Sequence, residues 1–70
     1  MLIIEHISPF AESPRVITQA EAERLAISSQ RIWWPVNVWD AEHDVRHGVK
    51  ESARMDLSAD RREYLLFRKA

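Results

Sequence analysis

The stretch RIWWPVNVWDAEHDVRHGVKESARMDL, residues 31–57, decides the predicted fold, because apolar and polar side chains alternate along most of it. Successive side chains of a strand point to opposite faces of the sheet, so this period of two predicts half-buried strands. We predict one strand over residues 31–39 and another over residues 45–57. With Val38 opposite Val45, the apolar residues of both strands share one face, and a slip of one residue would scatter them.

Pro35 is the main difficulty for the first of these strands. Proline lacks the N–H group that a central strand donates, so within sheets it is confined to edges, bulges and strand starts. Two arrangements therefore stay open. Either residues 31–39 form an edge strand up to Pro35, or regular pairing begins at Val36.

The rest of the chain predicts two more strands and one helix. Residues 1–7 and 62–69 are rich in aliphatic and aromatic side chains, which favours strands. Residues 8–15 contain two prolines and predict an extended connection. Thr18 and Glu21 have the spacing of a capping box, so a helix is expected to begin there and to end near residues 29–30. Its apolar stripe has small side chains: Ala22, Leu25, Ala26 and Ser29.

Charge favours one register for the second hairpin. Pairing Met55 with Tyr64 would set like charges opposite each other, Asp56 against Glu63 among them, and such pairs are destabilising. Pairing Met55 with Leu65 avoids this repulsion. We therefore predict the second register, closed by a three-residue loop that contains no glycine.

These elements predict a small two-layer α+β domain, in the order β-α-β-β-β, with one helix packed on a mostly antiparallel sheet. Seventy residues make a single domain, residues 1–70, near the lower limit of what folds unaided. The chain has no cysteine for a disulfide or a thiolate metal site. Small chains without such links often complete their core by oligomerising, so a homodimer is a second expectation.

The predicted core combines residues from the helix and from the face that it covers. Its members are Ile3, Ile4, Ala22, Leu25, Trp34, Val36, Val38, Val49, Met55, Leu65 and Phe67.

Composition limits where in the cell the protein is expected and which class of partner it is expected to bind. The segment Met1–Ile4 lacks the basic leader of a signal peptide, and no apolar run approaches the roughly 20 residues that span a bilayer. We therefore expect a cytoplasmic protein without membrane contact. The net charge is −1, although residues 45–70 carry seven basic against four acidic side chains. This bias is far weaker than that of a dedicated nucleic-acid binder.

His43 and His47 are spaced by four residues, as in zinc peptidases, with Asp44 where those enzymes carry glutamate. On a helix the two rings would share one face, with Asp40 as a third ligand and Gly48 as the helix end. On a strand they would lie roughly 13 Å apart, at about 3.3 Å per residue. The alternation favours the strand. Aspartate is also one methylene short for the general-base role, so no metal site is predicted.

The candidate site is an aromatic and basic surface on the sheet face opposite the helix. No nucleophile motif is present, and a single glycine excludes a glycine-rich phosphate loop, so neither an enzyme nor a cofactor is expected. Tryptophan, tyrosine and arginine are the residues most enriched at protein-binding hot spots. The predicted partner-binding residues are Trp33, Trp39, Arg46, Lys50, Arg54, Tyr64 and Arg68.

Three interpretations of this surface remain open. We favour a non-enzymatic regulator or inhibitor, of phage type, that docks onto a larger protein through the sheet face or a sheet edge. The alternative is a single-strand nucleic-acid binder, with bases stacked on the tryptophans and arginines along the backbone. The third is a second apolar layer, covered by residues 8–15 or by a twin subunit.

Overall fold

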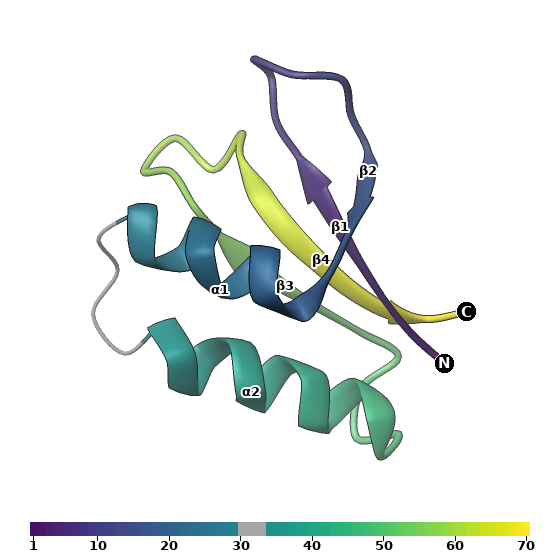
Figure 1. Ribbon diagram of the computed structural model, residues 1–70. Helices are drawn as coiled ribbons and strands as arrows, with labels where there is room; N and C mark the ends of the chain where they lie inside the picture. Colours follow the sequence, from purple (N-terminus) through teal and green to yellow (C-terminus); the bar gives the residue numbers. More distant parts are fainter. Residues whose placement is uncertain (30–33) are drawn as a thin grey trace.

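Two helices pack on one face of a four-stranded antiparallel sheet in the computed structural model (Figure 1), which describes the backbone of residues 1–29 and 34–70 and the side chains of residues 1–29 and 38–70. The sheet order is β2-β1-β4-β3. This confirms the predicted α+β class and the antiparallel sheet. The elements are β1 (Leu2–Ile7), β2 (Arg15–Ile17), α1 (Gln19–Ser28), α2 (Trp34–Arg46), β3 (Ser52–Asp56) and β4 (Tyr64–Lys69).

The largest correction is α2, which occupies residues for which two strands were predicted. The predicted strand over residues 31–39 is wrong from Trp34 onward, the strand over 45–57 is confined to Ser52–Asp56, and the Val38–Val45 hairpin does not form. Residues 31–33 lie outside the described residues. Val38 and Val45 are both fully buried, seven positions apart on one side of α2.

Local chemistry explains why a helix forms there. Pro35 lies in the first turn, where its missing N–H has no helical acceptor. Gly48 follows the last turn with φ +74°, the left-handed conformation that glycine adopts most easily after a helix. Its amide donates to the Val45 carbonyl at 3.3 Å. Both residues that disfavour a strand therefore fit a helix.

The sheet still has four strands because Arg15–Ile17 forms β2. This strand begins at the last residue of the predicted connection, residues 8–15, and extends two residues beyond it. It pairs with β1 through Ile4–Ile17, Glu5–Val16 and His6–Arg15. The C-terminal strand, β4, lies between β1 and β3, so the edges of the sheet are β2 and β3.

The β3–β4 hairpin confirms the register predicted from charge. Met55 pairs with Leu65, and Ala53 pairs with Phe67. The connection is longer than the predicted three residues, because the last ladder bond runs from the Leu57 amide to the Glu63 carbonyl at 2.8 Å. Arg61 takes the left-handed position in this loop, with φ 63°.

Helix α1 begins with the predicted capping box. The Glu21 amide donates to the Thr18 hydroxyl at 3.2 Å, and the Thr18 amide donates to the Glu21 carboxylate at 3.3 Å. The helix ends at Ser28 with Ser29 as its cap, within the predicted bounds. Ala22 and Ala26 are fully buried, so the small apolar stripe lies against the sheet as expected.

We expect Thr18→Ala to lower the free energy of unfolding by about 1 kcal/mol, since it leaves an amide of the first turn without its side-chain acceptor. Chemical denaturation followed by circular dichroism measures this change. Thr18→Ser keeps the hydroxyl and should retain most of the stability. An equal loss in both variants would show that the methyl group, and not the cap, matters at this position.

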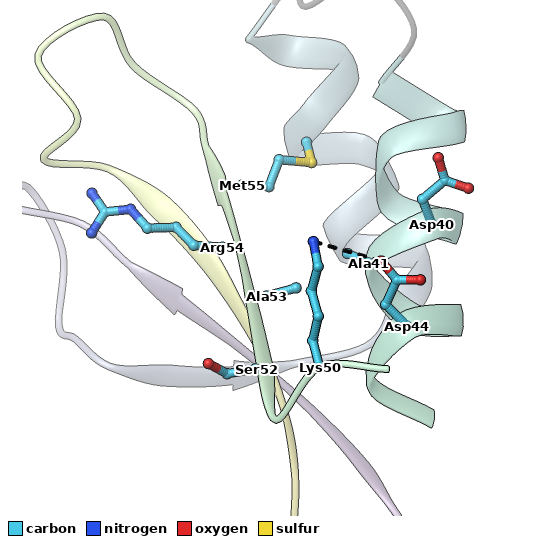
Figure 2. A pocket seen from close by; sticks show the side chains of 8 residues that line it. All are labelled: Asp40, Ala41, Asp44, Lys50, Ser52, Ala53, Arg54 and Met55. Carbon is cyan, nitrogen blue, oxygen red and sulfur yellow. Dashed lines mark ion pairs between the residues drawn. The ribbon is translucent and has the colours of Figure 1, made fainter. Parts of the chain in front are cut away.

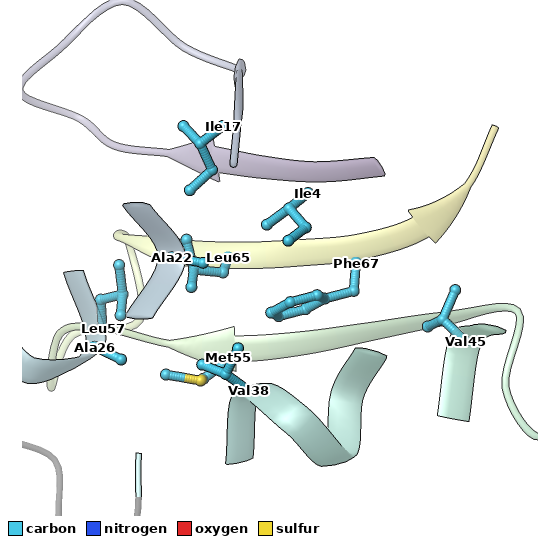
Figure 3. Packing of buried hydrophobic residues seen from close by; sticks show 10 residues of the cluster. All are labelled: Ile4, Ile17, Ala22, Ala26, Val38, Val45, Met55, Leu57, Leu65 and Phe67. Carbon is cyan, nitrogen blue, oxygen red and sulfur yellow. The ribbon is translucent and has the colours of Figure 1, made fainter. Parts of the chain in front are cut away.

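The core lies between the helices and the inner face of the sheet (Figure 3). Six of the predicted core residues are buried, and Leu25 packs against them. Val49 is instead 65% exposed, because the strand predicted there is a turn after α2. Ile3 is half-buried on the other face of β1, and the side chains of Trp34 and Val36 lie outside the described residues. The core residues are Ile4, Ile17, Ala22, Ala26, Val38, Val45, Met55, Leu57, Leu65 and Phe67.

In the part of the chain that the structure describes, neither helix has the length and hydrophobicity needed to cross a membrane.

Candidate functional site: the open face of the sheet

The sheet face opposite the helices is the candidate functional surface. Both helices lie on one side of the sheet (Figure 1), and Ile4, Leu65 and Phe67 point to that side. Their strand neighbours therefore point to the other side, which no helix of the described residues covers. We call this surface the open face; its residues are Ile3, Glu5, Ile7, Val16, Ser52, Arg54, Asp56, Tyr64, Leu66 and Arg68.

Apolar and charged side chains alternate on the central strands of the open face. Ile7 lies opposite Tyr64, but Leu66 lies opposite Glu5 and Ile3 lies opposite Arg68. The four apolar residues Ile3, Ile7, Tyr64 and Leu66 are each half-buried. Val16 adds an apolar side chain on β2 and is 66% exposed. A surface that combines exposed apolar side chains with tyrosine and arginine has the composition of a protein-binding hot spot.

The charged residues of the open face are paired with each other. The Arg68 Nε donates to the Glu5 carboxylate at 2.7 Å. The Nε atoms of Arg54 and Arg61 donate to the two oxygens of Asp56 at 2.8 and 2.9 Å. The hydrogen bond from Arg54, with that from Arg61, lowers the pKa of Asp56 below its usual range. Arg68 is paired with Glu5, and Arg54 and Arg61 share Asp56, so most of the charge on this surface is compensated.

Arg54 also stacks on Tyr64, with its guanidinium carbon 3.7 Å from the ring centroid. This cation–π contact holds the guanidinium flat on the open face. A second bond, from its Nη2 to the Arg61 carbonyl at 2.7 Å, joins β3 to the hairpin loop.

The structure brings only part of the predicted site together. Arg54, Tyr64 and Arg68 lie on the open face as expected. Trp39 and Arg46 do not, because they belong to α2 on the other side of the sheet. Trp33 lies outside the described residues.

The displaced residues have contacts of their own. Trp39 is 53% exposed, and its indole Nε1 donates to Glu23 at 3.0 Å, which joins α2 to α1. Arg46 lies 3.9 Å from the carboxylate of Glu42, one turn earlier on α2. Lys50 follows α2, and its Nζ lies 3.6 Å from the Asp44 carboxylate. These side chains do not contribute to the open face.

His43 and His47 lie at the end of α2, so the predicted strand separation is wrong. The His47 amide donates to the His43 carbonyl at 3.0 Å, and the ring centroids are 4.4 Å apart. Among the described residues no third histidine, cysteine or carboxylate joins them in a group able to hold a metal. His6 is the buried histidine, and its Nε2 lies 2.8 Å from the Glu63 carboxylate.

The sequence-based prediction missed the β1 half of the open face. Ile3, Glu5 and Ile7 alternate with the buried Ile4 and His6. This alternation was hidden because residues 2–4 are all aliphatic, which favours a strand covered on both sides. The signal was the charged Glu5, which a doubly covered strand would not accommodate without a partner.

Comparisons with models of protein families, with curated proteins and with solved structures found no match.

Proposed function

We propose that this protein is a small non-enzymatic binding module, a regulator or inhibitor that docks its open face onto a larger protein. The observation that carries the proposal is the combination, on the open face, of half-buried apolar side chains with charges that are already paired with each other. A partner can bury Ile3, Leu66 and Tyr64 without stripping water from an unpaired charge, which is the costly step at an interface. A cytoplasmic location and a phage-type role belong to the same proposal. The location is inferred from the sequence, and the phage-type role only from the small size of the protein.

The charge on the open face favours a protein over a nucleic acid. Binding to a polyanion draws its affinity from cations that neutralise phosphates. Here Arg54 and Arg68 are already held by Asp56 and Glu5. Breaking these pairs would cost affinity and would leave carboxylates facing the phosphates. Tyrosine and arginine are, in addition, enriched at protein-binding hot spots.

The test compares two double variants with matched chemistry. Ile3→Gln with Leu66→Gln removes two apolar side chains from the open face. Ile27→Gln with Val49→Gln removes two exposed apolar side chains, 50% and 65% accessible, from α1 and from the turn after α2. Each protein is used for affinity capture from an extract of the source organism, and bound proteins are quantified by mass spectrometry. Thermal unfolding of each variant first establishes that it is folded.

We expect one protein to be captured by the wild type and by the control variant and to be lost with the open-face variant. Hot-spot truncations cost about 2 kcal/mol or more, which is roughly thirtyfold in affinity. Equal capture by all three proteins would overturn the proposal. A retained nucleic acid whose affinity falls steeply with salt would favour the single-strand binder. A wild-type homodimer that the open-face variant dissociates would make a second copy the occupant.

A further inference from the structure

His43 and His47 form an exposed histidine pair at the C-terminal end of α2. The His47 amide donates to the His43 carbonyl at 3.0 Å, so the helical repeat continues through His47 and places the two residues one turn apart. Their rings lie side by side, with centroids 4.4 Å apart and ring planes 33° from parallel. A strand would have held them roughly 13 Å apart. Because this segment is helical, both rings can reach one ligand.

The separation of the two rings suits one tetrahedral metal ion. Bonds of about 2.0–2.1 Å from Zn²⁺ to imidazole place two ligating nitrogens roughly 3.3 Å apart. The nitrogens lie at the edges of the rings, so centroids 4.4 Å apart allow this separation after a small rotation of two exposed side chains. The pair therefore has the reach of a bidentate metal ligand.

The Asp44 carboxylate supports one ring of the pair. It lies 3.6 Å from the Nδ1 atom of His43. A carboxylate on this side favours the tautomer that carries its proton on Nδ1, which leaves the lone pair of Nε2 for a metal. The other side of Asp44 is held by the Lys50 ammonium group at 3.6 Å (Figure 2). Asp44 is thus placed as the outer partner of a histidine ligand.

The end of α2 is electrostatically suited to a cation. The aligned peptide dipoles give the C-terminus of a helix a partial negative charge, which stabilises a positive ion there. The two neighbouring basic side chains are directed at carboxylates. Arg46 lies 3.9 Å from Glu42, and Lys50 is paired with Asp44.

The imidazole rings select the class of ion. Neutral imidazole suits Zn²⁺ and Ni²⁺, whereas Mg²⁺ and Ca²⁺ take oxygen ligands. In the described part of the chain no third residue joins the pair as a ligand, the sequence-predicted Asp40 included. The chain therefore supplies two ligands and leaves the other coordination positions to water.

We propose that His43 and His47 chelate one divalent transition-metal ion of the Zn²⁺ and Ni²⁺ class at the end of α2. The ion would join two consecutive turns. Because the rings meet only when this segment is helical, the ion binds the folded protein in preference to the unfolded chain and stabilises it. This inference goes beyond the function proposed above and is independent of it, since α2 lies on the other side of the sheet from the open face (Figure 1).

The probe is Zn²⁺, titrated calorimetrically into the full chain without an affinity tag. We expect one ion per chain, and no competition from Ca²⁺ or Mg²⁺ in excess. In NMR spectra the imidazole signals of His43 and His47 should shift. Those of His6, which is buried against Glu63, should not, so the third histidine of the chain is an internal control. Zn²⁺ should also raise the melting temperature.

Three variants test the spacing. His43→Gln and His47→Gln should each weaken Zn²⁺ binding by about tenfold or more, because one imidazole remains and the second contact is no longer intramolecular. His43→Gln combined with Arg46→His keeps two exposed histidines but places them at consecutive positions, about 100° apart around the helix. This variant should bind as weakly as the single variants. It also loses a positive charge, so attraction to net charge alone would make it bind more tightly. Circular dichroism first establishes that each variant is folded.

Several outcomes would overturn the proposal. They are an absence of binding at Zn²⁺ concentrations on the order of 1 mM, equal affinity of the wild type and His47→Gln, or undiminished binding by the variant with consecutive histidines. Displacement of Zn²⁺ by Ca²⁺ would assign the ion to the carboxylates of α2 instead. The Ile3→Gln, Leu66→Gln variant should bind Zn²⁺ like the wild type, so the two proposals fail separately.

Discussion

Leu65→Ala is expected to lower the free energy of unfolding by about 2–5 kcal/mol, the range for truncating a large buried aliphatic side chain. Leu65 is fully buried in the core (Figure 3). It lies on the central strand β4, where it pairs with His6 on β1 and Met55 on β3. A domain of this size has a total stability on the order of 4–10 kcal/mol. The substitution therefore removes a large part of it, and urea denaturation followed by circular dichroism measures the loss.

The neighbouring residue provides the matched control. Leu66 is the same amino acid, one position along the same strand, and it points to the open face. Leu66→Ala should cost less than about 1 kcal/mol, because the Leu66 side chain is only half-buried in the folded state and its truncation therefore loses less buried apolar area. The difference between the two variants tests the orientation of β4 directly. Equal costs, or a larger cost for Leu66→Ala, would show that the faces are assigned wrongly.

The confirmed predictions were those that depended on one local interaction, with no other interaction favouring a different structure. Thr18 and Glu21 form a capping box through contacts three residues apart, so no distant partner was needed to predict it. The pairing of Met55 with Leu65 followed from avoiding like charges across the hairpin, which the correct register does. The length of the connecting loop was not predictable in this way, because Arg61 adopts a left-handed conformation that glycine usually supplies.

Residues 34–46 were predicted wrongly because their apolar residues satisfy two periods at once. Val36 and Val38 fit the period of two, whereas Val38, Ala41 and Val45 fit the helical spacing of three and four. The alternation of residues 45–57 was extended backward across this ambiguity. Pro35 and the polar run of residues 42–44 were the signals for a helix, since proline is tolerated in a first turn.

The same error affected the prediction of the candidate site. The strand assignment placed Trp39 and Arg46 on the sheet face. Because the segment is a helix, both residues lie on the other side of the sheet. Arg54, Tyr64 and Arg68 kept their place because the β3–β4 register was right.

Glu42 is a buried carboxylate in α2 without full compensation. Its residue is 4% exposed, and in the described part of the chain its Oε1 has no hydrogen-bond partner. Burial raises the pKa of this carboxyl above its ordinary value of 4.5. Arg46 opposes the rise, and the Glu23 carboxylate adds to it. The charged form is therefore disfavoured in the folded state.

We expect Glu42→Leu to raise the free energy of unfolding at pH 7 by about 1–3 kcal/mol, the cost of a buried polar group that lacks a partner. The folded wild type holds the Glu42 proton more tightly than the unfolded chain does. Its stability consequently falls as pH rises from about 4.5 through the raised pKa of the folded state, and recovers as pH falls. The advantage of the variant should accordingly shrink as pH is lowered across this window.

Arg46→Gln, one helical turn from Glu42, is expected to change the stability at pH 7 in the opposite direction to Glu42→Leu. It removes the cation 3.9 Å from Glu42, so it should raise the pKa of that carboxyl further and lower stability at pH 7. In the Glu42→Leu background the same change should have little effect, because the charge that Arg46 compensates is gone. Urea denaturation of the four proteins between pH 4 and pH 8 measures the coupling. A stabilising effect of Glu42→Leu that is constant across this range would show that packing, and not the buried charge, limits the stability of α2.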